Sequence, residues 1–150
     1  MKRYKRFFEE AIPDWVYQED YQNFDKNMYL RWKRKNVTIR GMQELGKENG
    51  GMGRFGIGLY TAFLGNREMA RQYGKVYFVL GAIPKHPKVV NTTNDAEIWF
   101  QNLVNNYCKS KNMKYDTEYF HMHTSYTKEM LRLGYDGFVI KGREMVNYRP

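Results

Sequence analysis

The chain has 150 residues, a formal charge of +9 and an aromatic content of 17%. This length suits one domain with a core of its own, and we predict a single domain over residues 1–150. The one cysteine, Cys108, excludes an internal disulfide and a cysteine-based metal site. The positive charge favours polyanionic partners: nucleic acid, phosphate-bearing ligands or acidic proteins.

We expect a cytoplasmic protein, in the cytoplasm of a cell or of a host cell. The charged run Met1–Arg6 is not followed by an apolar segment of signal-peptide length. No apolar run approaches the length of a membrane span, so we expect no membrane partner. The oligomeric state is left open, with a monomer as the expectation.

Residues 1–36 are predicted to form a helical N-terminal part of the same domain. Apolar residues recur there at helical spacing, at Tyr21, Phe24, Met28 and Trp32. The basic run 31–35 that closes this part is either a solvated helix end or a phosphate-binding patch.

The pattern then changes to short strands with helices between them. Strands are predicted at Val37–Ile39, Leu59–Phe63, Val76–Leu80 and Val89–Val90. Residues 43–54 are polar and glycine-rich, which predicts a loop. Asn66 is expected to cap a short helix that runs to Tyr73 and ends at Gly74.

The last third of the chain predicts two helices and a hairpin. Apolar residues at helical spacing indicate a helix over 94–108, with Asn94 and Glu97 as its capping pair. A second helix is expected near 125–133. Residues 137–140 and 144–148 are predicted to be the two strands of a β-hairpin, with a turn at 141–143. The predicted fold class is α+β.

Two motifs are set aside. Gly51–Gly56 spells G-x-G-x-x-G, but a dinucleotide fingerprint needs an apolar strand before it and a helix after it, and a strand is predicted to follow. His121 and His123 would point to one face of a strand, yet no third ligand stands at a useful spacing, so we expect no metal. Cys108 lies on the apolar face of its helix, as a core thiol does.

Three motifs remain, and they lie on separate predicted strands. They are Arg40-Gly41, the segment Phe55–Ala62, and Glu144. Together these motifs resemble those of the ADP-ribosyltransferase superfamily, and the resemblance implies NAD+ as a co-substrate. The cationic nicotinamide ring is attracted to aromatic faces, which Tyr60 and Tyr73 offer, although Tyr73 equally suits helix packing.

The remaining candidates match the other parts of NAD+. The backbone of Gly41 lets a ligand approach, and Arg40 can fork onto a phosphate or ribose oxygen. Cleavage of the nicotinamide–ribose bond builds positive charge on the ribose. A carboxylate beside that ribose, such as Glu144, stabilises this charge and can hold the 2′-hydroxyl.

In these motifs the chain resembles the ADP-ribosyltransferase superfamily over about residues 37–150. The poly(ADP-ribose) polymerase and diphtheria-toxin branch has a His-Gly pair, a Phe-Gly-x-Gly-[Ile/Leu]-Tyr-x-Ala segment, a helix with Ala and Tyr, and a late Glu before an apolar strand. The corresponding residues here are Arg40-Gly41, Phe55–Ala62, Ala70 with Tyr73, and Glu144. The segment 134–140 is also similar to small phage and bacterial transferases of this superfamily.

The resemblance implies a fold, an activity and a site. The fold would be split antiparallel β-sheets with N-terminal and inserted helices, and the activity NAD+-dependent mono-ADP-ribosylation without a metal. Glu144 would be the catalytic residue. The cofactor-binding residues would be Arg40, Gly41, Gly58, Tyr60, Thr61 and Tyr73.

The chain departs from the superfamily pattern at three places. Arg40 replaces the His of the polymerase branch. The other branch of toxins, which has Arg at that place, usually carries a Ser-Thr-Ser strand, and here Thr61 supplies the one hydroxyl. Arginine-modifying relatives carry a second Glu or Gln two residues before the catalytic Glu, where this chain has Gly142. The resemblance therefore argues against arginine as acceptor, and favours nucleic acid or a protein with an acidic surface.

Two other functions remain open. One is an NAD+ glycohydrolase, in which water is the acceptor. The other is a basic nucleic-acid-binding or inhibitor protein that has the fold without the chemistry, whose binding would weaken steeply with salt.

Overall fold

The computed structural model describes residues 37–42 and 52–149. The predicted helices within residues 1–36 and most of the predicted loop 43–54 lie outside these residues. The described residues fall into two compact units, and β4 (Leu59–Ala62) carries the chain from the second unit into the first. The single-domain prediction stays a prediction, and each unit is described by itself.

The first unit contains residues 37–42 and 61–83. Strand β1 (Val37–Met42) lies between β5 (Lys75–Leu80) and the end of β4. It pairs antiparallel with β5 over its whole length, from Val37↔Leu80 to Met42↔Lys75, and Ile39 pairs with Ala62. Helix α4 (Arg67–Arg71) precedes β5 in the chain.

The start of α4 follows the predicted capping residue. The side chain of Asn66 accepts a hydrogen bond from Met69 N at 3.3 Å, which satisfies one of the free amides of the first turn. Gly74 has a φ of 127°, a conformation that glycine adopts without a steric penalty. The predicted cap at Asn66 is therefore confirmed, whereas the helix ends at Arg71 and not at Tyr73 as predicted.

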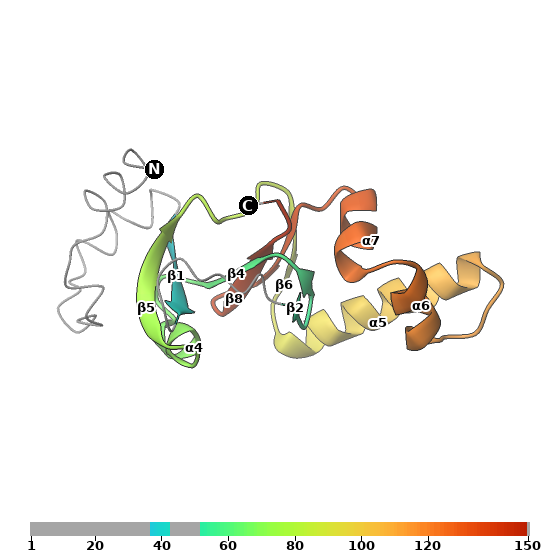
Figure 1. Ribbon diagram of the computed structural model, residues 1–150, viewed down its shortest axis with the longest axis horizontal. Coiled ribbons are helices and arrows are strands. Elements are labelled where there is room, and N and C mark those ends of the chain that lie inside the picture. Colours follow the sequence, from blue (N-terminus) through green and yellow to red (C-terminus); the bar gives the residue numbers. More distant parts are fainter. Residues whose placement is uncertain (1–36, 43–51, 150) are drawn as a thin grey trace. The chain divides into compact units, whose positions relative to one another are not determined.

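The second unit contains residues 52–60 and 84–149. Strand β7 (Gly137–Ile140) pairs in parallel with β6 (Pro87–Val90) and antiparallel with β8 (Glu144–Asn147). Parallel neighbours need a long crossover, and here the crossover consists of helices α5 (Thr93–Ser110), α6 (Thr117–His123) and α7 (Tyr126–Arg132). Figure 1 shows α6 alongside the C-terminal part of α5.

The fold class is α+β, as predicted, and three details of the prediction are wrong. The β6–β7 pair is parallel, so the sheets are not wholly antiparallel. His121 and His123 lie on helix α6 and not on a strand. Helix α5 is capped by Thr92, whose hydroxyl accepts from Asp95 N at 3.1 Å, so Asn94 is inside the helix and not its cap.

The glycine-rich run forms a small hairpin. Strand β2 (Met52–Gly53) pairs antiparallel with β3 (Gly56–Ile57), and Gly56 has a φ of 110°. No helix follows at the place where a dinucleotide fingerprint would have one, since β3 is succeeded by β4. The prediction that strand structure follows the glycines is confirmed, and the loop prediction is wrong at Met52–Gly53.

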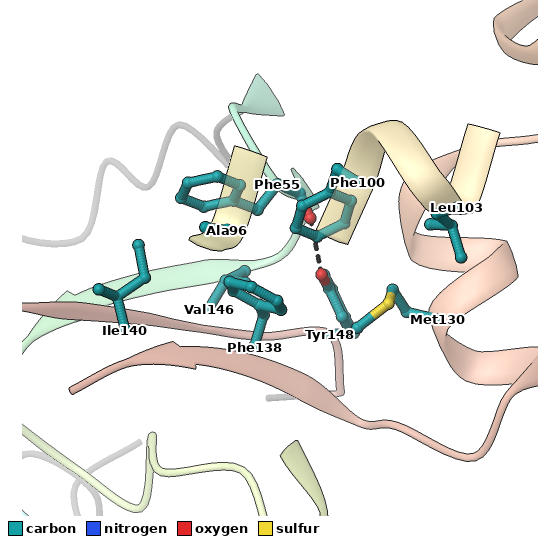
Figure 2. Packing of buried hydrophobic residues seen from close by; sticks show 9 residues of the cluster. All are labelled: Phe55, Ala96, Phe100, Leu103, Met130, Phe138, Ile140, Val146 and Tyr148. Atoms are coloured by element: carbon teal, nitrogen blue, oxygen red, sulfur yellow. Dashed lines mark hydrogen bonds between the residues drawn. The ribbon is translucent and has the colours of Figure 1, made fainter. Parts of the chain in front are cut away.

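An aromatic core joins this hairpin to α5 and the β7–β8 pair (Figure 2). Phe55 lies with its ring centroid 5.4 Å from Phe100 and 5.4 Å from Phe138. The Tyr148 hydroxyl donates to the carbonyl oxygen of Phe55 at 2.6 Å, a bond between residues far apart in the chain. The hairpin is therefore fixed to β8, the strand that carries Glu144.

Candidate functional site

Glu144 is the first residue of β8 and lies opposite Ile140 of β7. Side chains alternate along a strand, so Glu144 shares a sheet face with Val146, which belongs to the aromatic core. Its side chain is 17% exposed. The carboxylate thus stands at the end of a packed apolar layer and is largely, but not wholly, shielded from water.

The environment of Glu144 sets the charge of its carboxyl. Burial raises the pKa of Glu144 above its ordinary value, and the positive charges of Arg143 and Arg54 act in the opposite direction. Arg143 Nε lies 4.0 Å from Glu144 Oε1. Arg54 forms an ion pair with Glu97 at the start of α5. Two guanidinium groups therefore border the carboxylate from the β2–β3 hairpin and from the β7–β8 turn.

Tyr60 is tied to the hairpin that precedes it. Its hydroxyl donates to the carbonyl oxygen of Gly56 and accepts from Phe55 N at 3.1 Å. Its ring covers Gly53, where an added Cβ would lie 2.1 Å from Tyr60 Cζ. The polar end of Tyr60 therefore has a structural task, and its side chain is partly buried against the aromatic core.

Gly58 brings this segment against β8. A Cβ at Gly58 would lie 2.6 Å from Asn147 O and 2.7 Å from Val146 Cγ2, so only glycine allows the approach. Its role in the structure is close backbone packing, two residues before Tyr60. The second unit thus contains Gly58, Tyr60 and Glu144, with Gly58 in direct contact with the Glu144 strand.

The first unit contains the other four candidates. Arg40 is half-buried on β1 opposite Tyr77. An added Cβ at Gly41 would lie 1.7 Å from Ala70 O, so this glycine lets α4 lie against β1, and its Cβ direction is filled by protein. Tyr73 follows α4 with its Cβ beside Gly41 and is 63% exposed.

Thr61 is the fourth candidate of the first unit and is buried, as Gly41 is. It is 3% exposed, and its hydroxyl oxygen has no hydrogen-bond partner within the described residues. A buried hydroxyl without a partner is uncommon and costs free energy.

An open pocket of about 190 Å³ lies beside Arg54 in the second unit. Its walls are formed by Arg54, Phe55, Glu97, Phe100, Gln101 and Tyr126. Ligand pockets usually measure about 300–1,000 Å³. This pocket is too small to hold a whole dinucleotide, and Glu144 is not among its walls.

Within residues 37–42 and 52–149, no cluster of three or more His, Cys, Asp or Glu side chains is arranged to hold a metal ion. Over the same residues, none of the helices has the length and apolar character needed to cross a membrane.

Sequence reasoning missed the two arginines that border Glu144. Arg143 is its neighbour in sequence and could have been noted as a nearby cation. Arg54 stands far from Glu144 and from its ion-pair partner Glu97 in the chain, and no periodicity relates them. Its one signal is its position as the sole charged residue within the run 50–58.

Comparison with protein-family models, with curated proteins and with solved structures finds no match to this chain. A function for it is therefore argued from its own residues.

Proposed function

We propose that this protein is an NAD+-dependent mono-ADP-ribosyltransferase, which cleaves the bond between nicotinamide and ribose and transfers ADP-ribose to a macromolecular acceptor. The observation that supports this most is the setting of Glu144. It is a largely buried carboxylate at the start of β8, the strand against which Gly58 of the Gly-x-Tyr60 segment packs.

The chemistry needs a fixed negative charge near the ribose. As nicotinamide leaves, positive charge develops on the ribose ring, and a carboxylate in a poorly hydrated place stabilises it more than water does. Glu144 meets this need in its ionised form. The role requires neither a covalent bond to the sugar nor a metal ion.

The other candidate residues would bind NAD+. The ring of Tyr60 would stack on nicotinamide, since its hydroxyl is held by Phe55 and Gly56. Arg40 and the backbone of Gly41 would contact phosphate or ribose oxygens and the carboxamide. Thr61 would direct its hydroxyl to the ribose, and the exposed Tyr73 would add a second aromatic face.

The turn before Glu144 supports an acceptor other than arginine. Gly142 occupies the position of the second acid in arginine-modifying relatives, and its φ is 71°. A Glu or Gln there would adopt a strained conformation. The backbone at position 142 therefore favours glycine over Glu or Gln. Without a second carboxylate there, the site has no base at this position to activate a weak nucleophile such as a guanidinium.

Incubation of the full chain with NAD+ labelled in the adenylate phosphate and a cell lysate tests the proposal. We expect release of nicotinamide and transfer of the label to macromolecules, which separate nuclease and protease digestions then classify. Free ADP-ribose without labelled macromolecules would instead identify an NAD+ glycohydrolase. No released nicotinamide would rule out both enzymatic functions.

The matched control replaces one carboxylate at a time. Glu144→Gln keeps the size of the side chain and removes its charge, and should lower the rate on the order of 10²–10³-fold. Glu118→Gln makes the same change at an exposed position on α6 and should leave the rate unchanged. Equal rates for the two variants would contradict the role of Glu144.

A further inference from the structure

Three aromatic rings and a lysine form a continuous row from α5 to α6, which we call the ring ladder (Lys111, Tyr107, Tyr119 and His123). Lys111 Nζ lies 5.6 Å from the ring centroid of Tyr107. The Tyr107 and Tyr119 centroids are 6.3 Å apart, and those of Tyr119 and His123 are 4.2 Å apart. The ladder thus ends in a cation on one side and an imidazole on the other.

The last ring of the ladder is held in place and is accessible. His123 is exposed, and its ring lies at 32° to that of Tyr119. His123 Nδ1 donates to the carbonyl oxygen of Tyr119 at 2.9 Å, one helical turn earlier. This bond fixes the orientation of the imidazole, so a flat ligand that stacks on it meets a ring with little rotational freedom left to lose.

Exposed lysines lie close in the chain to Lys111, which is at the other end of the ladder from His123. Lys109, Lys111 and Lys114 are all exposed. The nearby acids are Asp116 and Glu118, and the Asp116 carboxylate accepts from Tyr119 N at 3.0 Å as the cap of α6. The lysines therefore outnumber the acids around the ladder, and one of those acids already has a bond within the protein.

We propose that the ring ladder binds single-stranded nucleic acid, with a base stacked on His123 and phosphates contacting Lys111 and the flanking lysines. Every base has a flat face that stacks on aromatic rings, and phosphates are attracted to lysine. An acidic protein would use the lysines without needing the ordered row of rings. The binding itself does not depend on the proposed function. The further step, that the bound nucleic acid is the acceptor of ADP-ribose, rests on the proposed function.

Fluorescence anisotropy of a labelled single strand of about 12 nucleotides, as RNA and as DNA, tests the binding without NAD+. We expect affinity to fall steeply with salt, and Lys111→Gln to reduce the slope of log K against log salt by about 0.7. His123→Ala should weaken binding about 5- to 150-fold through loss of one stacked base, whereas His123→Phe, which keeps a ring, should retain most of the affinity.

Two controls make the result decisive. Lys85→Gln removes an exposed lysine of the same unit away from the ladder and should change affinity less than Lys111→Gln. Polyglutamate should compete poorly with the single strand. Salt-insensitive or absent binding, equal effects of the two lysine variants, no effect of His123→Ala, or polyglutamate competing as well as the oligonucleotide would each overturn the proposal.

The outcomes separate this inference from the proposed function. If the chain binds the oligonucleotide through the ladder but releases no nicotinamide from NAD+, the proposed binding site stands and the proposed transferase activity is contradicted. Nicotinamide release with label on protein alone, and no oligonucleotide binding, would retain the enzyme and refute the inference.

Discussion

The hydroxyl of Tyr60 accepts from Phe55 N and donates to Gly56 O, and it thereby closes the turn of the β2–β3 hairpin. The motif that suggests a nicotinamide-stacking ring thus includes a structural bond that the sequence does not reveal. The partners are only four and five residues away, but they depend on the hairpin geometry and not on a pattern of residue types.

Tyr60→Phe separates the two tasks of this side chain. Loss of the hydroxyl leaves the Phe55 amide and the Gly56 carbonyl without this partner, so we expect the free energy of unfolding to fall by about 1–3 kcal/mol. The ring remains, so activity measured well below the melting temperature should persist. Urea unfolding measures the first effect, with Tyr115→Phe at a half-exposed position as control. Equal stability of Tyr60→Phe and the parent chain would contradict the structural role.

Glu144 should lower the stability of the fold at neutral pH. Burial raises its pKa, so the folded chain binds this proton more tightly than the unfolded chain does, and stability falls as pH rises through the interval between the two pKa values. Glu144→Gln removes this penalty. We expect the variant to be more stable than the parent chain at pH 7, and the difference to shrink below about pH 4, where the unfolded carboxyl is also protonated.

Urea unfolding of both proteins at the two pH values checks this expectation. A variant that is less stable at pH 7, or a difference that grows as the pH falls, would show that the ionised carboxylate stabilises the fold instead.

Among the elements, those with a strong local signal were predicted from the sequence. Helix α5 has a long apolar stripe, and the β7–β8 hairpin has two apolar segments on either side of a glycine-containing turn. Helix α6 was missed because it buries only Phe120, which is too little for an apolar periodicity to show in its sequence. Its one sequence signal was Asp116, whose side chain caps the helix.

The parallel β6–β7 pair could not be read from either strand. Val89 and Val139 are opposite each other in register, but this pairing depends on how three helices return the chain to the sheet. The packing roles of Gly41 and Gly58 could not be predicted from the sequence either. A side chain at these positions would overlap Ala70 and Val146, respectively, and both of these residues are remote in the chain.

Gly41→Ala tests whether α4 needs close contact with β1. The new methyl group would overlap Ala70 O, so we expect the free energy of unfolding to fall by about 1–3 kcal/mol or more. Tyr73→Ala is the control, since it keeps the Cβ beside Gly41 and removes only an exposed ring, with an expected change within about 0.5 kcal/mol. Thermal unfolding distinguishes the two. A harmless Gly41→Ala would mean that α4 does not lie this close to β1.

For the whole molecule, the structure divides the predicted site residues between two units. Arg40, Gly41, Thr61 and Tyr73 belong to one unit, and Gly58, Tyr60 and Glu144 to the other. Sequence reasoning identified residues on both sides, because each motif is local. It could not supply Arg54, whose charge acts on Glu144 only because of the packing of the second unit.

The most direct measurement is the rate of nicotinamide release from NAD+ by the purified full chain, by Glu144→Gln and by Glu118→Gln. The proposed function predicts release by the parent chain and by Glu118→Gln, and a rate on the order of 10²–10³-fold lower for Glu144→Gln. Absence of release by the parent chain, or an unchanged rate for a folded Glu144→Gln, would contradict it.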